Sequence, residues 1–400
     1  MAAPLAHARS FGISGSEDLS LKVEENIKKG ELLKAFALTE RKRQNLVAEL
    51  AEANALQVQV ASKIFAQRDP AALFITTDYK PTDFLVELLQ LDDLYDPSDS
   101  FSKMTDKTQK KWLQTVQGKS AQGVAPTKGS VERTDLKDSS DQISLREKVE
   151  RIARSMQLFD KREAALSHYK YGAWLGAFLI GVRNNLNNLV KAWNEGIRFD
   201  NLVVFTGERY LRKEAGQEDD IAKLCDPSQS PLPFKKDWKL PEGVKYDTEY
   251  DMMKLVFDQV ELPEDMAKAL LGKVTFVNAL KGTNLRPGTK DCYITWLKNN
   301  PEPGTIFAVS YPLLWSAQQI AGTTLLGDSY PLDTTAPALS AEEYERRKPA
   351  VVSLVHDTVT KCLFEINNRL KAQKAPQPSK IVPFPKDETK KQSIGSGSKG

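Results

Sequence analysis

Residues 174–206, WLGAFLIGVRNNLNNLVKAWNEGIRFDNLVVFT, contain two apolar runs separated by a longer amphipathic stretch. The runs at 174–180 and 199–206 have the length and composition of buried strands. Between them, apolar residues such as Val182, Leu186 and Leu189 recur at helical spacing. A strand, a helix and a second strand in this order predict two parallel strands joined by a right-handed crossover.

The same alternation continues along the chain toward residue 321. Apolar runs at 274–279 and 305–310 predict two more strands, and apolar residues at helical spacing predict the helices between and after them, at 248–260, 291–297 and 313–321. A closing helix begins near Pro349. We therefore expect an α/β domain over residues 143–372, with a mostly parallel sheet covered by helices on both faces.

The rest of the chain has a different character. Residues 1–118 are expected to be mainly helical, with a long helix or helical hairpin at 31–67, a strand at 72–77 and a short helix through Phe84 and Leu89. Residues 119–142 are rich in Gly, Ser, Thr, Lys and Asp, which is typical of a linker or long loop. The pattern Ser144-Leu-Arg-Glu147 predicts a capping box at the start of the next helix. Residues 373–400 lack periodicity and predict a disordered basic tail.

The overall composition excludes several classes of protein. The 400 residues carry a net charge of only +3, and six lysines after residue 373 account for the basic balance, so we expect no nucleic-acid binding. The three cysteines are far apart, which predicts neither a disulfide framework nor a zinc site. No signal peptide is visible, and no window approaches the roughly 18 apolar residues of a membrane span. We therefore expect a cytoplasmic protein without a membrane span.

Common catalytic and cofactor motifs are absent from the sequence. There is no G-x-G-x-x-G after the first predicted strand, no H-E-x-x-H and no G-x-S-x-G. Gly118-Lys-Ser resembles the end of a phosphate loop, but Leu113 occupies the position of the first glycine. Only three histidines are present, which argues against catalysis or metal binding by histidine. The cofactor, if the protein uses one, stays unknown at this level.

Polar and glycine residues gather where the predicted strands end. In an open parallel sheet, ligands bind beyond the carboxyl ends of the strands, where glycine exposes backbone N–H groups and arginine pairs with phosphate or carboxylate. The candidate ligand-binding residues are Gly181, Arg183, Thr206, Gly207, Glu208, Arg209, Asn278, Arg286, Thr289 and Ser310.

Structural roles compete with ligand binding at most of these positions. Thr206-Gly207 also suits a tight turn, and Thr289 also suits the N-cap of the next helix. Glu249 opens a helix, where an acidic residue is favoured by the helix dipole alone. Arg286 is the residue with the weakest structural explanation.

The first functional hypothesis is a domain that binds a phosphate-bearing or nucleotide-like small molecule. In this hypothesis Arg209 and Arg286 hold the anion, and Glu249 or Asp291 acts as a general base or metal ligand, so these two carboxylates are the catalytic candidates. Whether the protein is an enzyme stays open.

The strand ends resemble those of the YdcF-like family, which includes SanA- and ElyC-type proteins. The resemblance covers roughly residues 172–322 and rests on short motifs: a glycine-ended first strand followed by an arginine, a small-residue turn, two characteristic helix starts and a final strand end. The matching residues are Gly181 and Arg183, Thr206-Gly207, Thr248-Glu249, Thr289-Lys-Asp291-Cys292 and Ala308-Val-Ser310. The resemblance implies a nucleotide-fold-like parallel α/β domain.

The second hypothesis is an interaction protein with a degenerate α/β core. Leu313 and Ser316 stand where the YdcF-like family has histidine and arginine, and Cys292 stands where it has asparagine. The helical N-terminal region would then contact a protein partner. A bacterial effector secreted into a host cell is a further alternative with the same features.

Overall fold

The computed structural model describes residues 32–113, 136–213, 218–280 and 287–374. Within them, five strands form a single sheet in the order β3-β2-β1-β4-β5, and every neighbouring pair is parallel. The strands are β1 (His168–Leu175), β2 (Arg198–Gly207), β3 (Val274–Ala279), β4 (Ile306–Val309) and β5 (Leu332–Thr335). The predicted α/β architecture with a mostly parallel sheet is confirmed.

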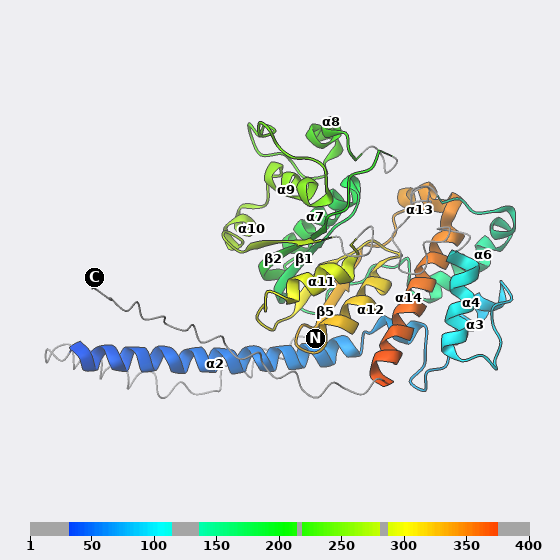
Figure 1. The fold of residues 1–400 in the computed structure, drawn as a ribbon, viewed down its shortest axis with the longest axis horizontal. Coiled ribbons are helices and arrows are strands. Elements are labelled where there is room, and N and C mark those ends of the chain that lie inside the picture. The colour runs from blue at the N-terminus through cyan, green and yellow to red at the C-terminus, as the bar shows by residue number, and fades with distance from the viewer. Residues whose placement is uncertain (1–31, 114–135, 214–217, 281–286, 375–400) are drawn as a thin grey trace, which may run out of the picture.

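Helices cover both faces of this sheet (Figure 1). Val204 of β2 packs in an apolar cluster with α7 and α9, whereas its neighbour Val203 packs in a second cluster with α11. Because successive residues of a strand point to opposite faces, the two clusters are the two sides of the sheet. The covering helices are α7 (Leu179–Asn194), α9 (Glu249–Gln259) and α10 (Glu264–Ala269) on one side, and α11 (Thr289–Leu297) and α12 (Trp315–Leu326) on the other.

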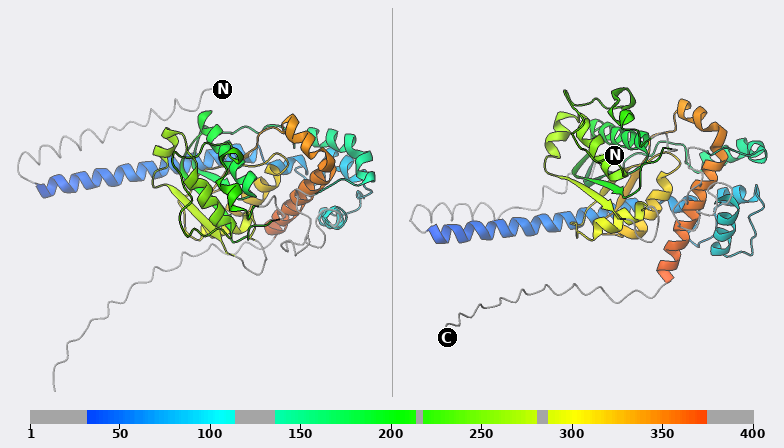
Figure 2. Two further views of the ribbon diagram at one scale, coloured as in Figure 1. Left: turned by 90° about the horizontal axis from the view of Figure 1, so that it is seen from above. Right: turned by 45° about the horizontal axis from the view of Figure 1, so that its top comes forward.

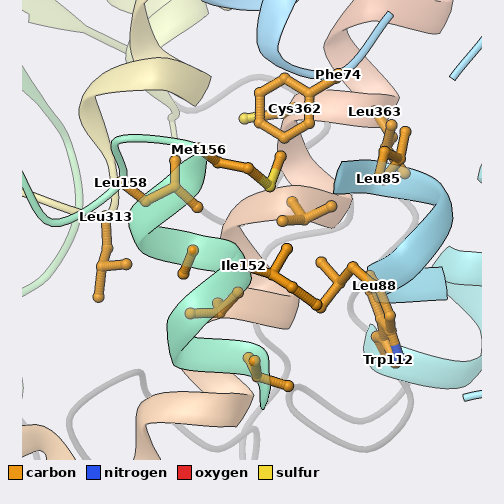
Figure 3. Packing of buried hydrophobic residues seen from close by; sticks show 14 of the residues in the cluster. Phe74, Leu85, Leu88, Trp112, Ile152, Met156, Leu158, Leu313, Cys362 and Leu363 are labelled. Carbon is orange, nitrogen blue, oxygen red and sulfur yellow. The ribbon is translucent and has the colours of Figure 1, made fainter. Parts of the chain in front are cut away.

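A third cluster joins helices from both ends of the chain (Figure 3). The long C-terminal helix α14 (Val351–Lys374) packs against α12 and so connects this cluster to the sheet. Leu85, Ile152 and Leu363 of this cluster have no exposed surface, and Figure 3 shows Ile152 beside Leu88 and Leu85 beside Leu363. The other elements are η2 (Pro70–Leu73), α3 (Asp83–Gln90), α4 (Phe101–Thr108), η3 (Gln109–Leu113), α6 (Ser140–Ser155), α13 (Ala341–Arg347) and η7 (Lys348–Ala350).

The predicted helix or hairpin at 31–67 is one continuous helix, α2 (Leu32–Ala66). Its last turns dock on the body, where Phe65 stacks on Tyr169 and Ser62 donates a 2.8 Å hydrogen bond to Asp328. Its N-terminal part extends away from the body in every view (Figures 1 and 2).

The first strand lies earlier in the chain than predicted. The expected strand at 174–180 is wrong, because β1 ends at Leu175 and α7 begins at Leu179. The apolar run spans the end of a buried strand, a short loop and the first two residues of the following helix, of which Leu179 is buried and Ile180 is exposed, so hydrophobicity alone does not mark the boundary.

Other local predictions also differ from the structure. The expected strand at 72–77 is replaced by η2, whose N-cap Asp69 accepts a hydrogen bond from the Ala71 N–H group. The capping box is formed by Ser139 and Gln142 rather than Ser144 and Glu147, so α6 begins inside the predicted linker. Strand β5 was not predicted, and the insertion after β2 contains α8 (Ile221–Cys225) and η6 (Pro227–Gln229). The predicted disordered tail lies outside the described residues, apart from its first two residues in α14.

Candidate functional site

The sheet order places a topological switch point between β1 and β4. From β1 the chain proceeds through β2 to β3 on one side, and from β4 to β5 on the other. In such sheets the helices after the two central strands diverge to opposite faces and leave a crevice at the carboxyl edge. Two loops follow the central strands at this edge: Gly176–Phe178, which is partly exposed, and Ser310–Leu314.

Four helices begin at this edge, and they differ in how their first N–H groups are satisfied. Asp251 completes a capping box at α9, and Asp291 accepts a 2.7 Å hydrogen bond from Gly288 at the start of α11. The N-cap residues of α7 and α12 are Phe178 and Leu314, which make no side-chain cap hydrogen bond. The two helices at the switch point therefore lack a side-chain cap, as does α11, whose N-cap is Gly288.

Beside the switch point lies a buried charge cluster that we call the Arg209 cluster, formed by Arg209, Glu218 and Glu249. The guanidinium of Arg209 donates two hydrogen bonds to Glu218, one of them 3.1 Å long, and lies 3.5 Å from Glu249. The side chains of Arg209 and Glu218 are 4% and 0% exposed. Burial raises the pKa of Glu218, and the positive charge of Arg209 opposes that shift.

The Arg209 cluster braces the loop after β1. Arg209 donates a 3.2 Å hydrogen bond to the Ala177 carbonyl, and its guanidinium lies 5.1 Å from the centre of the Phe178 ring. A Cβ atom on Gly176 would lie 2.7 Å from the Glu249 carboxylate, so a larger residue here would displace that carboxylate. Because the cluster contains two carboxylates and one guanidinium, Arg209 is already neutralised by side chains of its own chain.

Two buried polar atoms at the same edge have no hydrogen-bond partner. They are Thr206 Oγ1 and Asn278 Oδ1, at the ends of β2 and β3. Thr206 and Asn278 are register partners on neighbouring strands, so their side chains lie on the same side of the sheet. An unsatisfied buried polar atom is costly, and a water or a ligand group is the usual explanation.

The thiol of Cys292 lies beside the end of β2, on the side of the sheet that α11 covers. It donates a 3.3 Å hydrogen bond to the Thr206 carbonyl. Burial raises the pKa of this thiol to about 12, so it remains protonated. Cys292 is a packing residue and a weak hydrogen-bond donor here.

Two predicted ligand residues lie in a helix rather than at the end of a strand, Gly181 in the first turn of α7 and Arg183 further along it. Gly181 and Arg183 belong to α7, because the first strand ends six residues before Gly181. Arg183 is 2% exposed and donates hydrogen bonds to the carbonyls of Leu224 (2.6 Å) and Gln229 (3.0 Å). It holds the insertion that contains α8 and η6 rather than a strand end.

The remaining predicted residues have identifiable local contacts. Gly207 packs against Pro287, and the Glu208 N–H group donates to the Ala279 carbonyl. Thr289 is the first residue of α11, and Gly288 is its N-cap. The Ser310 hydroxyl donates to the side chain of Gln318. Arg286 lies outside the described residues.

The structure therefore pairs Thr206 with Asn278 across neighbouring strands and brings Arg209 to Glu249. Sequence reasoning missed Glu218 because it lies in an irregular insertion with no periodic pattern. It also missed the Gly176–Phe178 loop, which the apolar run hid inside a predicted strand. The glycine within that run was the one available signal of a turn.

The comparisons with known proteins identify no relative. No family model, no curated protein and no solved structure matches this chain. In the four described ranges, no helix has the length and apolar character needed to cross a membrane. The same ranges contain no group of three or more His, Cys, Asp or Glu side chains arranged to hold a metal ion.

Proposed function

We propose that this protein binds a small phosphate-bearing or nucleotide-like molecule at the carboxyl edge of its sheet, with the anionic group at the N-terminus of α7. One observation carries the proposal. The helix after the central strand β1 begins at the switch point without a side-chain cap, next to a partly exposed glycine-containing loop. The first N–H groups of a helix and its dipole attract anions at this position.

The neighbouring strand ends suit the uncharged part of such a molecule. Thr206 and Asn278 offer hydrogen-bonding atoms without a partner, and Glu208 directly follows β2. In dinucleotide-binding sheets a carboxylate at this strand end accepts hydrogen bonds from sugar hydroxyls. The Arg209 cluster carries one more negative than positive charge, so it favours hydroxyl groups over a second phosphate.

The proposal is tested by changing the N-cap of α7. Phe178 already has the extended backbone of an N-cap residue (φ −65°, ψ 160°), so Phe178→Asp supplies a cap that occupies the first N–H groups and adds a negative charge. We expect the variant to fold and to lose the stabilisation that phosphate compounds give the wild-type protein. Thermal unfolding is measured with inorganic phosphate, adenosine 5′-monophosphate and adenosine. At 100 times its dissociation constant, a ligand adds about 2.7 kcal/mol.

Phe178→Asn is the matched control. It removes the same ring and offers a similar cap without the charge, so it should bind the phosphate compounds more strongly than Phe178→Asp. If adenosine stabilises the protein as much as its monophosphate does, the anionic site at α7 is wrong. If none of the three compounds stabilises the wild-type protein, binding of this ligand class is rejected.

The proposal includes no catalytic step. Asp291 is engaged in capping α11, and Glu249 is engaged with Arg209. A general base must be within hydrogen-bonding reach of the proton that it removes, and the substrate would have to displace these contacts first.

A further inference from the structure

The N-terminal part of α2 is a helix with solvent on most of its surface. We call residues 38–57 the arm. Between Arg43 and Ala53 every side chain is exposed, and the first helix face that packs on the body begins at Asn54 and Val58 and continues to Ala61 and Phe65. Figures 1 and 2 show the arm extending away from the body.

An apolar stripe, separate from the face that docks on the body, runs along the arm and continues past it to Val60. Leu46, Leu50, Ala53 and Val60 follow one another at steps of four, three and seven residues, with Gln57 at the intervening position. Leu46, Leu50 and Val60 are 45%, 62% and 48% exposed. Apolar residues at alternating steps of four and three form the contact seam of a two-stranded coiled coil.

Basic residues of the arm lie mainly on the N-terminal side of the centre of this stripe, and acidic residues lie mainly on the C-terminal side. Arg41, Lys42 and Arg43 lie on its N-terminal side, where Glu40 is the single acid, and Glu49 and Glu52 lie on its C-terminal side. A helix of the same sequence running in the opposite direction places its acidic half beside the basic half of the first. A parallel copy would place like charges together, which is unfavourable.

We propose that a second copy of this chain covers the stripe, so that two arms form an antiparallel coiled coil about a two-fold axis near Leu46 and Leu50. A two-fold interface uses the same patch on both subunits, and the charges of the arm are complementary to those of a second, antiparallel arm. Its 20 residues span about 30 Å. The two bodies then lie at opposite ends of the coiled coil, so neither blocks the other.

The first experiment measures the mass of the full chain by sedimentation velocity across micromolar concentrations. We expect a dimer for the wild-type protein and a monomer for Leu50→Glu, which changes an exposed residue and should leave the fold intact. Ala55→Glu adds the same charge to the opposite face of the arm and should remain dimeric. Circular dichroism and thermal unfolding confirm that both variants are folded.

The second experiment tests the direction of pairing. A spin label on Thr39→Cys, in a Cys225→Ser background because the other two cysteines are buried, reports the distance between the two arm tips. Antiparallel pairing predicts about 25–30 Å, and parallel pairing predicts a separation near 10 Å. A short distance overturns the antiparallel arrangement.

Two further outcomes overturn the proposal. A dimer that persists in Leu50→Glu would assign self-association to another surface. A wild-type monomer would assign the stripe to another occupant. If removal of residues 1–31 then produced a dimer, that occupant would be the chain's own N-terminal segment.

Discussion

Replacing Arg209 with methionine is expected to lower the free energy of unfolding by about 3–5 kcal/mol, because it leaves the buried Glu218 without its counter-charge. Methionine retains much of the arginine volume, so the loss reports charge rather than a cavity. Urea denaturation followed by circular dichroism measures the effect. A loss below about 1 kcal/mol would contradict the structural role of this ion pair.

The matched control removes both partners. In Arg209→Met/Glu218→Leu no carboxylate of the pair remains buried, and replacing both charges with apolar groups is often close to neutral. We expect the double variant to recover more than half of the stability lost in Arg209→Met. If the double variant loses as much stability as Arg209→Met or more, the unpaired charge of Glu218 is not the cause of the loss in the single variant.

The second large effect is a loss of stability in acid that originates at His356. This side chain is 1% exposed and stacks on Trp112, with ring centres 4.0 Å apart, and neither of its ring nitrogens has a hydrogen-bond partner. Burial lowers its pKa to about 4, although Asp92 lies 3.6 Å away and favours the charged form. Lys111 is the other charged group that acts on the ring, and it disfavours protonation.

The direction of the effect follows from the proton balance. Between pH 6.5 and about 4 the unfolded chain binds a proton at this histidine and the folded protein does not, so stability falls as the pH is lowered through this window. Each pH unit costs about 1.4 kcal/mol, which gives a total of about 3 kcal/mol. Below pH 4 this contribution becomes constant.

Unfolding free energies from urea titrations at several pH values test this effect. His356→Phe keeps a ring against Trp112 but cannot titrate. Carboxylates also titrate at the lower end of the window, so the difference in pH slope between wild type and variant is the quantity to compare. Equal slopes from pH 6.5 to pH 4 would show that the wild-type histidine is protonated in the folded protein as readily as in the unfolded chain.

The sheet was predictable where the strands consist mainly of apolar residues. The predicted strand at 274–279 coincides with β3, and the predicted strand at 199–206 lies within β2. β5 was not predictable, because its Asp333 and Thr334 are polar. Asp333 accepts hydrogen bonds from Tyr169 (2.6 Å) and from the backbone of Ala165 (2.7 Å). Such partners lie far apart in the sequence and have no local signature.

Some features of the candidate site could likewise be recognised from the sequence, and others could not. Polar residues after β2 and β3 could be recognised from the sequence, and the structure brings Thr206 and Asn278 into register. The roles of Arg183 and Arg209 could not be recognised from the sequence, because only three-dimensional contacts distinguish an arginine that binds carbonyls from one that faces a ligand. The resemblance to the YdcF-like family stays a prediction.

The sequence by itself determined the alternation of strands and helices, because burying a parallel sheet on both faces requires continuous apolar runs and helices with one apolar side. It also determined the charge pattern and apolar stripe of α2, which depend on residue order alone. Only the tertiary structure decided which polar groups are already paired and which remain available. A buried charge pairs with an opposite charge that lies close to it in space. Glu218 comes close to Arg209 only after the chain has folded.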